Sequence, residues 1–160
     1  MLTRKNDAQM DFDLTAVVEG GRENPIWYVQ YASARCHSSR GQARKYFPNH
    51  DMSLFALAAT TISCLTDESE LGLIKTIAGW PRLVEAAADA HEPHRIAYYL
   101  YELAAQFHAF WEKGKDPSFK IVQEDNEKLT MARLVLVQGV QTVIDSGLGI
   151  FGIEPVEEMR

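Results

Sequence analysis

Residues 24–47 read NPIWYVQYASARCHSSRGQARKYF, and this stretch predicts a long helix with two distinct faces. Asn24 suits the position that caps a helix N-terminus. Pro25 suits the first turn, where its missing N–H would have no partner anyway. At helical spacing, one stripe of apolar or small residues is expected to lie on a core: Ile26, Val29, Ser33 and Cys36.

A second stripe on this predicted helix consists of Tyr28, Tyr31 and Arg35, at positions i, i+3 and i+7. Two flat rings followed by a guanidinium group can stack on bases and hold a phosphate, which indicates nucleic-acid binding. The same spacing is typical of core aromatic residues beside a solvated arginine. Spacing alone therefore leaves both interpretations open.

The rest of the chain also predicts helices. The clearest begins at Pro93 and ends at Gly114, because apolar residues recur every three or four positions: Ile96, Leu100, Leu103, Phe107 and Phe110. Residues 66–70 open another helix, with Leu71, Ile74 and Ala78 on one side and a break at 79–81. Within residues 49–66, the segment 54–59 favours a helix and 60–63 an irregular path.

The last strong pattern spans residues 127–146, with Gly147 placed to cap the helix C-terminus. A short helix is expected over residues 14–19, between Asp13 and a pair of glycines. No long stretch alternates apolar and polar residues as a strand would. The predicted fold class is therefore all-α, a bundle of five or six helices.

Composition and charge limit the function further. The 160 residues are 46% hydrophobic and 24% charged, which indicates one self-sufficient folded domain. No segment approaches the ~20 apolar residues that cross a bilayer, and residues 1–7 contain no apolar signal-peptide region. Cys36 and Cys64 show no paired metal-ligand spacing, which indicates reduced thiols and a cytoplasmic location.

The net charge of −6 argues against a general affinity for nucleic acid. Residues 22–47, however, carry five basic residues and one acid, whereas residues 51–160 carry nine basic residues and 17 acids. The positive charge is thus concentrated on the helix that carries the Tyr–Tyr–Arg stripe. This distribution predicts a local, directed contact with a polyanion.

Several motifs, in one order along the chain, resemble the anticodon-binding (DALR) domain of arginyl-tRNA synthetases. The run from Asn24-Pro25 through Tyr28-Val29-Gln30-Tyr31-Ala32 to Ala34-Arg35 resembles the first long helix of that domain. Residues 92–95 with Tyr99-Leu100 and Leu103-Ala104 resemble a later helix. The last set of motifs resembles the C-terminal helix and tail of the family: Arg133-Leu134, Gly147-Leu148, Gly152-Ile153, Pro155, Glu157 and Met159.

The resemblance implies a division of the chain and a set of site residues. Residues 1–14 would end the linker from a catalytic domain that is missing here, and residues 15–160 would form the DALR domain. Such a domain binds the splayed anticodon loop of arginine tRNAs, whose middle base is C. The resemblance places these residues at the anticodon: Tyr28, Tyr31, Arg35, Trp111 and Met159. Three positions depart from the family pattern: Ser33 replaces a common His, Trp111 a Tyr, and Glu158 an Arg.

The chemistry of amino-acid activation has no counterpart in this chain. The His-x-Gly-His and Lys-Met-Ser-Lys-Ser signatures of class I synthetases are missing, as is a glycine-rich phosphate loop. ATP and arginine are therefore expected to bind the catalytic domain, and this chain alone should be inactive as a ligase. His91 and His94 suggest a metal pair, but no third ligand has a clear place, so we predict no metal.

The expected partners are arginine tRNAs and the catalytic domain of the same polypeptide, and neither DNA nor a membrane. Two alternatives remain open at this level. The bundle could be a docking module that contacts the catalytic domain through residues 1–14 without touching RNA. It could also be the equivalent domain of another class I synthetase, such as the cysteine enzyme.

Overall fold

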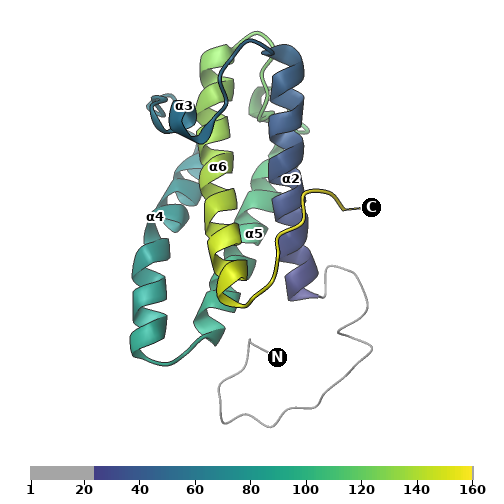
Figure 1. Ribbon diagram of the computed structural model, residues 1–160. Helices are drawn as coiled ribbons and strands as arrows, with labels where there is room; N and C mark the ends of the chain where they lie inside the picture. The colour runs from purple at the N-terminus through teal and green to yellow at the C-terminus, as the bar shows by residue number, and fades with distance from the viewer. Residues whose placement is uncertain (1–23, 160) are drawn as a thin grey trace.

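The computed structural model describes residues 24–159, which form a bundle of α-helices (Figure 1). The long helices are α2 (Pro25–Tyr46), α4 (Glu68–Asp89), α5 (His94–Lys113) and α6 (Glu127–Ile150). The shorter elements are α3 (Leu54–Ala58) and the 3-10 helix η1 (Pro117–Phe119). Within the described range there is no strand, and the all-α prediction is confirmed. The expected helix over residues 14–19 and the linker segment 1–14 lie outside the described residues.

The four long helices lie side by side, with α2 and α5 running in one direction and α4 and α6 in the other (Figure 1). Both α2 and α4 pack on α5 and α6, and α5 and α6 also contact each other. The periodic positions of α5 are all buried, as predicted. The largest fully buried apolar side chains are Phe107, Phe110, Leu57, Leu73, Leu100, Leu103, Leu134 and Ile144.

Helix α2 begins as its sequence predicts. The Asn24 side chain accepts hydrogen bonds from the backbone N–H groups of Ile26 (3.0 Å) and Trp27 (3.3 Å). Val29, Ser33 and Cys36 are buried, but Ile26 is 48% exposed and lies before Val29, the first buried residue of α2. The stripe prediction is therefore right for three of its four members.

Helix α4 corrects the predicted break at residues 79–81. It continues through Pro81, with Leu73, Trp80 and Ala87 on its buried face, whereas Leu71 is 50% exposed. Proline in a helix interior removes one backbone hydrogen bond, but tertiary packing can compensate for that loss. Here Trp80 packs into the core and its Nε1–H donates to Ser146 Oγ at 3.3 Å. Packing has therefore outweighed the local break signal.

The end of α6 corrects the role predicted for Gly147. The helix runs on to Ile150, and its capping glycine is Gly152, which has φ of 68°. The Ile153 N–H donates to the Leu148 carbonyl and the Gly152 N–H to the Gly149 carbonyl, both at 3.0 Å, as in a Schellman motif. Gly147 is instead buried against α5, where a Cβ atom would come within 2.6 Å of Leu100 Cδ2. Its role is to allow the close approach of α5 and α6.

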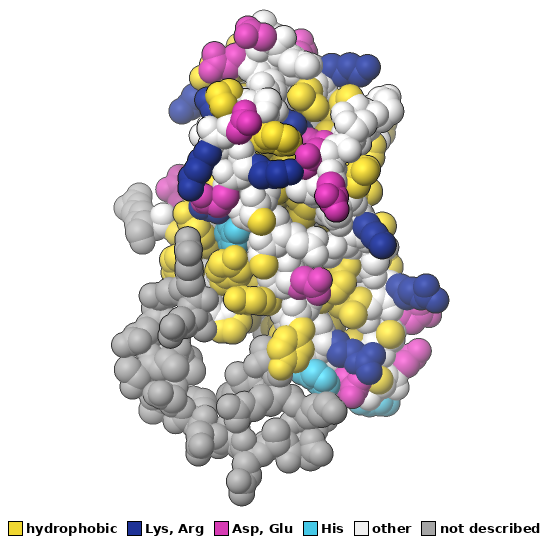
Figure 2. Space-filling view, turned by 180° about the vertical axis from the view of Figure 1, so that it is seen from behind, with side chains coloured by type: hydrophobic (Ala, Val, Ile, Leu, Met, Phe, Trp, Pro, Cys, Tyr) yellow, Lys and Arg dark blue, Asp and Glu magenta, His cyan; other side chains and the backbone are white. Residues whose placement is uncertain are grey.

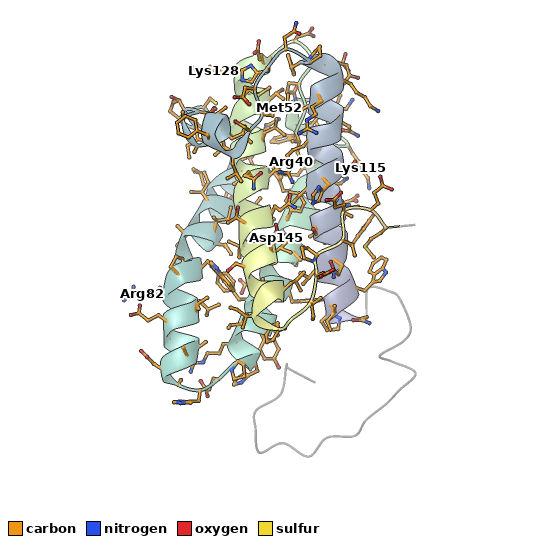
Figure 3. The ribbon with its side chains drawn as sticks, viewed as in Figure 1. Arg40, Met52, Arg82, Lys115, Lys128 and Asp145 are labelled. Atoms are coloured by element: carbon orange, nitrogen blue, oxygen red, sulfur yellow. The ribbon has the colours of Figure 1, made fainter. Side chains whose placement is uncertain are left out.

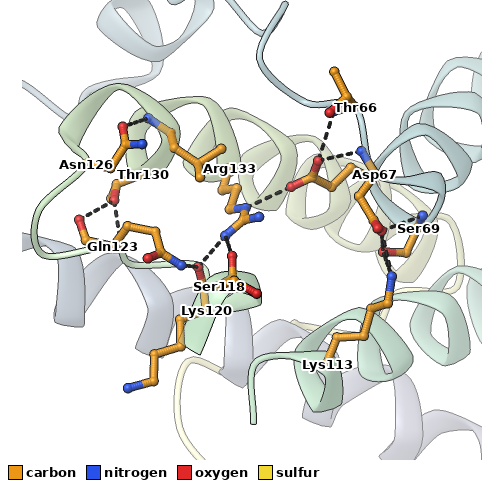
Figure 4. Close-up of polar contacts among 12 residues, drawn as sticks. Thr66, Asp67, Ser69, Lys113, Ser118, Lys120, Gln123, Asn126, Thr130 and Arg133 are labelled. Carbon is orange, nitrogen blue, oxygen red and sulfur yellow. Dashed lines mark hydrogen bonds and ion pairs between the residues drawn. The ribbon is translucent and has the colours of Figure 1, made fainter. Parts of the chain in front are cut away.

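A buried ion pair fastens α4 to α6 (Figure 4). Arg133 Nε donates to Glu70 Oε1 at 2.8 Å, and both side chains are at least 95% buried. Glu70 Oε2 also accepts from the N–H groups of Thr66 and Asp67, each at 3.1 Å, within the capping box of α4. Arg133 Nη1 donates to the carbonyls of Ser118 (3.1 Å) and Lys120 (2.6 Å), which fixes the η1 segment.

None of the helices in residues 24–159 is long and apolar enough to cross a membrane.

Candidate nucleic-acid interface

Helix α2 presents Tyr31 and Arg35 one turn apart, and α5 brings Trp111 beside them. The guanidinium carbon of Arg35 lies 4.4 Å from the Tyr31 ring centroid and 5.1 Å from the Trp111 ring centroid. A planar cation against two aromatic faces is a favourable arrangement, and all three side chains line one hollow of the surface. The indole of Trp27 extends it, because it stacks on Tyr31 at 5.2 Å and 28°.

Arg35 is held from behind by His108, a residue that the sequence analysis did not single out. Arg35 Nη1 lies 2.9 Å from His108 Nδ1, and His108 Nε2 lies 3.1 Å from the Tyr28 carbonyl oxygen. Arginine only donates hydrogen bonds, and a carbonyl only accepts them. The contacts therefore require a neutral His108 whose Nδ1 accepts from Arg35 and whose Nε2–H donates to Tyr28.

Two further contacts fix the second nitrogen of the Arg35 guanidinium. Nη2 lies 3.2 Å from the Tyr31 hydroxyl and 3.4 Å from Glu112 Oε1. Lys115 Nζ approaches the other Glu112 oxygen at 2.5 Å. This Lys115 contact, and secondarily Arg35, hold the pKa of the Glu112 carboxyl below its ordinary value. Arg35 thus keeps one face on the rings and shares an exposed carboxylate with a lysine.

Four of the five predicted site residues line one hollow. Tyr31 and Arg35 on α2, Trp111 on α5 and Met159 in the tail surround a space of about 730 Å³, within the usual size range for ligand pockets. We call it the stacking hollow. Lys45, His37 and Glu158 also line it. Glu158 therefore brings a carboxylate to a surface where the family pattern has an arginine.

The fifth predicted residue, Tyr28, takes a different place. Its half-buried ring packs against His108 (centroids 4.5 Å apart) and Tyr101 (5.0 Å), and it does not line the stacking hollow. Tyr28 is therefore separate from the other four residues, and its role at the anticodon stays a prediction. Its carbonyl and ring support His108, which in turn supports Arg35.

The C-terminal tail reaches the hollow because Gln30 holds it along α2 (Figure 1). Gln30 Nε2 donates to the Glu154 carbonyl and Gln30 Oε1 accepts from the Val156 N–H, both at 2.8 Å. The side-chain amide thereby mimics a backbone pairing partner. A lone glutamine on a helix gives no sequence signal for this contact, although Gln30 belongs to the motif of the first long helix.

The positive charge of α2 is less available than its sequence suggests. Arg40 lies between α2 and α6 (Figure 3), where it donates to Gln138 Oε1 at 2.5 Å and to Gln141 Oε1. Gln141 also contacts His37, on the rim of the stacking hollow. The Ser33 hydroxyl is buried without a hydrogen-bond partner among the described residues. Because Arg40 is engaged with α6, the lysine and arginine side chains of α2 that line the stacking hollow are Lys45 and Arg35.

Comparison with known proteins identifies the family. Residues 29–159 match the model of the DALR anticodon binding domain, which covers more than half of the chain. The chain belongs to this family. The arginine–tRNA ligase of Azorhizobium caulinodans is 53% identical over 161 residues, which cover the whole chain and 28% of that ligase. The DALR domain described here therefore spans less than a third of the length of this relative.

Solved structures agree with the assignment. A Campylobacter jejuni protein shares the fold with a TM-score of 0.78 at 23% identity, over 99% of this chain and 32% of that one. The arginyl-tRNA synthetase of Thermus thermophilus gives a TM-score of 0.68 at 27% identity, over 99% of this DALR domain and 25% of that chain. The recognition made from the sequence motifs is confirmed.

Proposed function

We propose that this chain binds the anticodon loop of arginine tRNAs, as the anticodon-binding part of an arginine–tRNA ligase. One observation carries the proposal: Tyr31, Arg35, Trp111 and Met159, from three separate segments, line a single hollow. Unstacked bases are the usual target of sequence-specific RNA recognition, and aromatic faces beside a guanidinium suit them. Tyr28 contributes indirectly, because its carbonyl and ring contact His108, which in turn contacts Arg35.

The longer ligase would charge tRNA with arginine in the cytoplasm, using ATP. ATP and arginine would bind a part of the polypeptide outside this chain. This chain would contribute only the binding of the anticodon. The chain alone should show no ATP–pyrophosphate exchange with arginine. Adding the separately expressed catalytic part should restore charging, at a rate that depends on this chain.

The direct test is a titration of the chain with an arginine tRNA transcript. Each stacked base contributes about 1–3 kcal/mol, so Arg35→Ala or Tyr31→Ala should weaken binding by roughly five- to hundredfold. The thermal unfolding midpoint of each variant shows whether the bundle stays folded. Arg82→Ala is a matched control, since Arg82 lies on α4, away from α2 and the tail (Figure 3).

A second arm of the experiment tests specificity. A transcript in which the middle anticodon base C is replaced by G should bind more weakly than the unaltered tRNA. Equal binding to both transcripts, with no loss in the Arg35 variant, would refute the proposal and leave a docking module without RNA contact.

A further inference from the structure

A second hollow lies on the other side of Trp111. It has a volume of about 500 Å³, and its lining includes Lys45, Trp111, Lys115, Lys120 and Glu124. Lys45, Gln42 and Trp111 line both hollows, so the indole forms part of the wall between them. We call the second space the lysine hollow. The two hollows therefore adjoin at these three residues.

Three ammonium groups reach the lysine hollow from three segments: Lys45 from α2, Lys115 from the turn after α5, and Lys120 from the residue after η1. Lys115 pairs with Glu112, whereas no ion pair joins Lys45 or Lys120 to another described residue. The backbone of Lys120 is held by its carbonyl, which accepts from Arg133 Nη1 and Gln123 Nε2. Its side chain extends away from the buried ion pair (Figure 4).

The acids of this hollow already have donors of their own. Glu112 is shared by Lys115 and Arg35. Glu124 accepts a hydrogen bond from the Tyr46 hydroxyl, which raises the pKa of Tyr46. Figure 2 shows the opposite side of the molecule from Figure 1, where Lys and Arg side chains lie among acidic ones over the upper half. The lining of the lysine hollow still carries three lysines against two carboxylates, and this local excess of positive charge in a chain of net charge −6 suits an external anion.

We infer that the lysine hollow binds backbone phosphates of the RNA strand whose base stacks at Trp111. This inference rests on the proposed function and adds a second subsite to it. Lysine ammonium groups bind phosphate oxygens as point charges and read no sequence. The subsite therefore adds affinity and salt dependence, while discrimination among anticodons stays in the stacking hollow.

The test removes two lysines that line the lysine hollow but not the stacking hollow. Because Lys115 also shares Glu112 with Arg35, the single variant Lys120→Gln, which leaves that carboxylate and its partners in place, is measured alongside. The double variant Lys115→Gln/Lys120→Gln is compared with Lys75→Gln/Arg82→Gln, which removes two exposed charges from α4 and so matches the change in net charge. Binding of full-length arginine tRNA to the 160-residue chain is measured by fluorescence anisotropy over a series of salt concentrations. The transcript with the altered middle anticodon base is titrated alongside.

We expect the lysine-hollow variant to weaken binding of both transcripts by about tenfold, because two lysine–phosphate contacts are lost. The slope of log K against log salt should fall by about 0.7–1 for each lysine removed, and the α4 variant should keep the slope of the unaltered chain. The affinity ratio between the two transcripts should stay unchanged.

Three results would overturn the inference. If both double variants bind alike while Arg35→Ala still loses binding, the lysine subsite is wrong and the proposed function stands. If the unaltered chain binds no tRNA, both fail. If the lysine-hollow variant loses affinity for a polyglutamate peptide but not for tRNA, the hollow accepts an acidic protein segment instead of RNA.

Discussion

Two arginines of this bundle are similar in chemistry and opposite in setting. Arg133 has a 5% exposed side chain, and its donors point to a buried carboxylate and two carbonyls at 2.6–3.1 Å. Arg35 has a 14% exposed side chain, and its contacts to Tyr31 and Glu112 are long, at 3.2 and 3.4 Å. Arg133 lines neither hollow, whereas Arg35 lines the stacking hollow.

The difference teaches where to look for function in an all-helical domain. Breaking a buried ion pair leaves an uncompensated charge in the interior, so such a pair matters mainly for folding. A guanidinium held by rings, one imidazole nitrogen and an exposed carboxylate can exchange partners at little cost. The Glu70–Arg133 side of the bundle is thus expected to govern stability, and the Arg35 side binding.

The sharpest way to break this contrast is Arg133→Met. It leaves the Glu70 carboxylate buried with only two backbone donors, and we expect the free energy of unfolding to fall by about 3–5 kcal/mol. Urea denaturation followed by circular dichroism measures the change. Arg35→Met is the matched control and should lose much less stability. Similar losses for the two variants would refute the division of roles.

An intermediate effect is expected for His108→Phe. Phenylalanine keeps a ring on the buried face of α5, but it removes the acceptor for Arg35 and the donor to the Tyr28 carbonyl. We expect a loss of about 1–3 kcal/mol in unfolding free energy, with weaker tRNA binding because Arg35 is no longer held. His94→Phe, at the other end of α5, should change neither quantity. Unchanged binding in the His108 variant would show that Arg35 needs no support from behind.

The smallest effect concerns Asp67, at the edge of the Glu70–Arg133 network. A hydrogen bond from Lys113, and then those from Ser69, lower the pKa of Asp67 to about 2 from 3.8. A carboxyl whose pKa is lower in the folded state stabilises the fold above pH 3.8, and this contribution disappears as the pH falls toward 2.

The variant Asp67→Asn keeps a good helix cap but removes the charge. It should be less stable than the unaltered chain by at most about 1 kcal/mol at pH 6, because the pair with Lys113 is partly exposed. The difference should shrink as the pH falls from about 4 to 2. Thermal unfolding over this range tests it, and a constant difference would contradict the assignment.

Local signals predicted much of this fold. The period of α5, the Asn24 cap, the start of α4 within residues 66–70 and the helix at residues 54–58 all appear where the sequence indicates them. These features depend on residues close together in the chain. The breaks expected at residues 79–81 and 147 failed because tertiary contacts decide them: Trp80 is packed against the core and Gly147 against Leu100.

The candidate site was predictable only in part, for the same reason. Tyr31, Arg35, Trp111 and Met159 were named from family motifs, and their roles at the anticodon remain predictions. Their convergence on one hollow depends on how α2 packs on α5 and where the tail runs. The role of His108 had one faint signal, a polar residue beside Phe107 on a buried face, which requires partners. The clamp at Gln30 and the lysine hollow depend on contacts distant in sequence.

The two hydrogen bonds of Gln30 hold the C-terminal tail, and tail residues 157–159 form one side of the stacking hollow. Beyond Ile153 the tail is fastened by two hydrogen bonds to a single amide, and its release would unwind no helix. Residues 157–159 should therefore exchange between closed and open positions independently of global unfolding. A ligand would then enter the stacking hollow while the tail is open. Closure of the tail over the bound ligand would slow its dissociation more than its association.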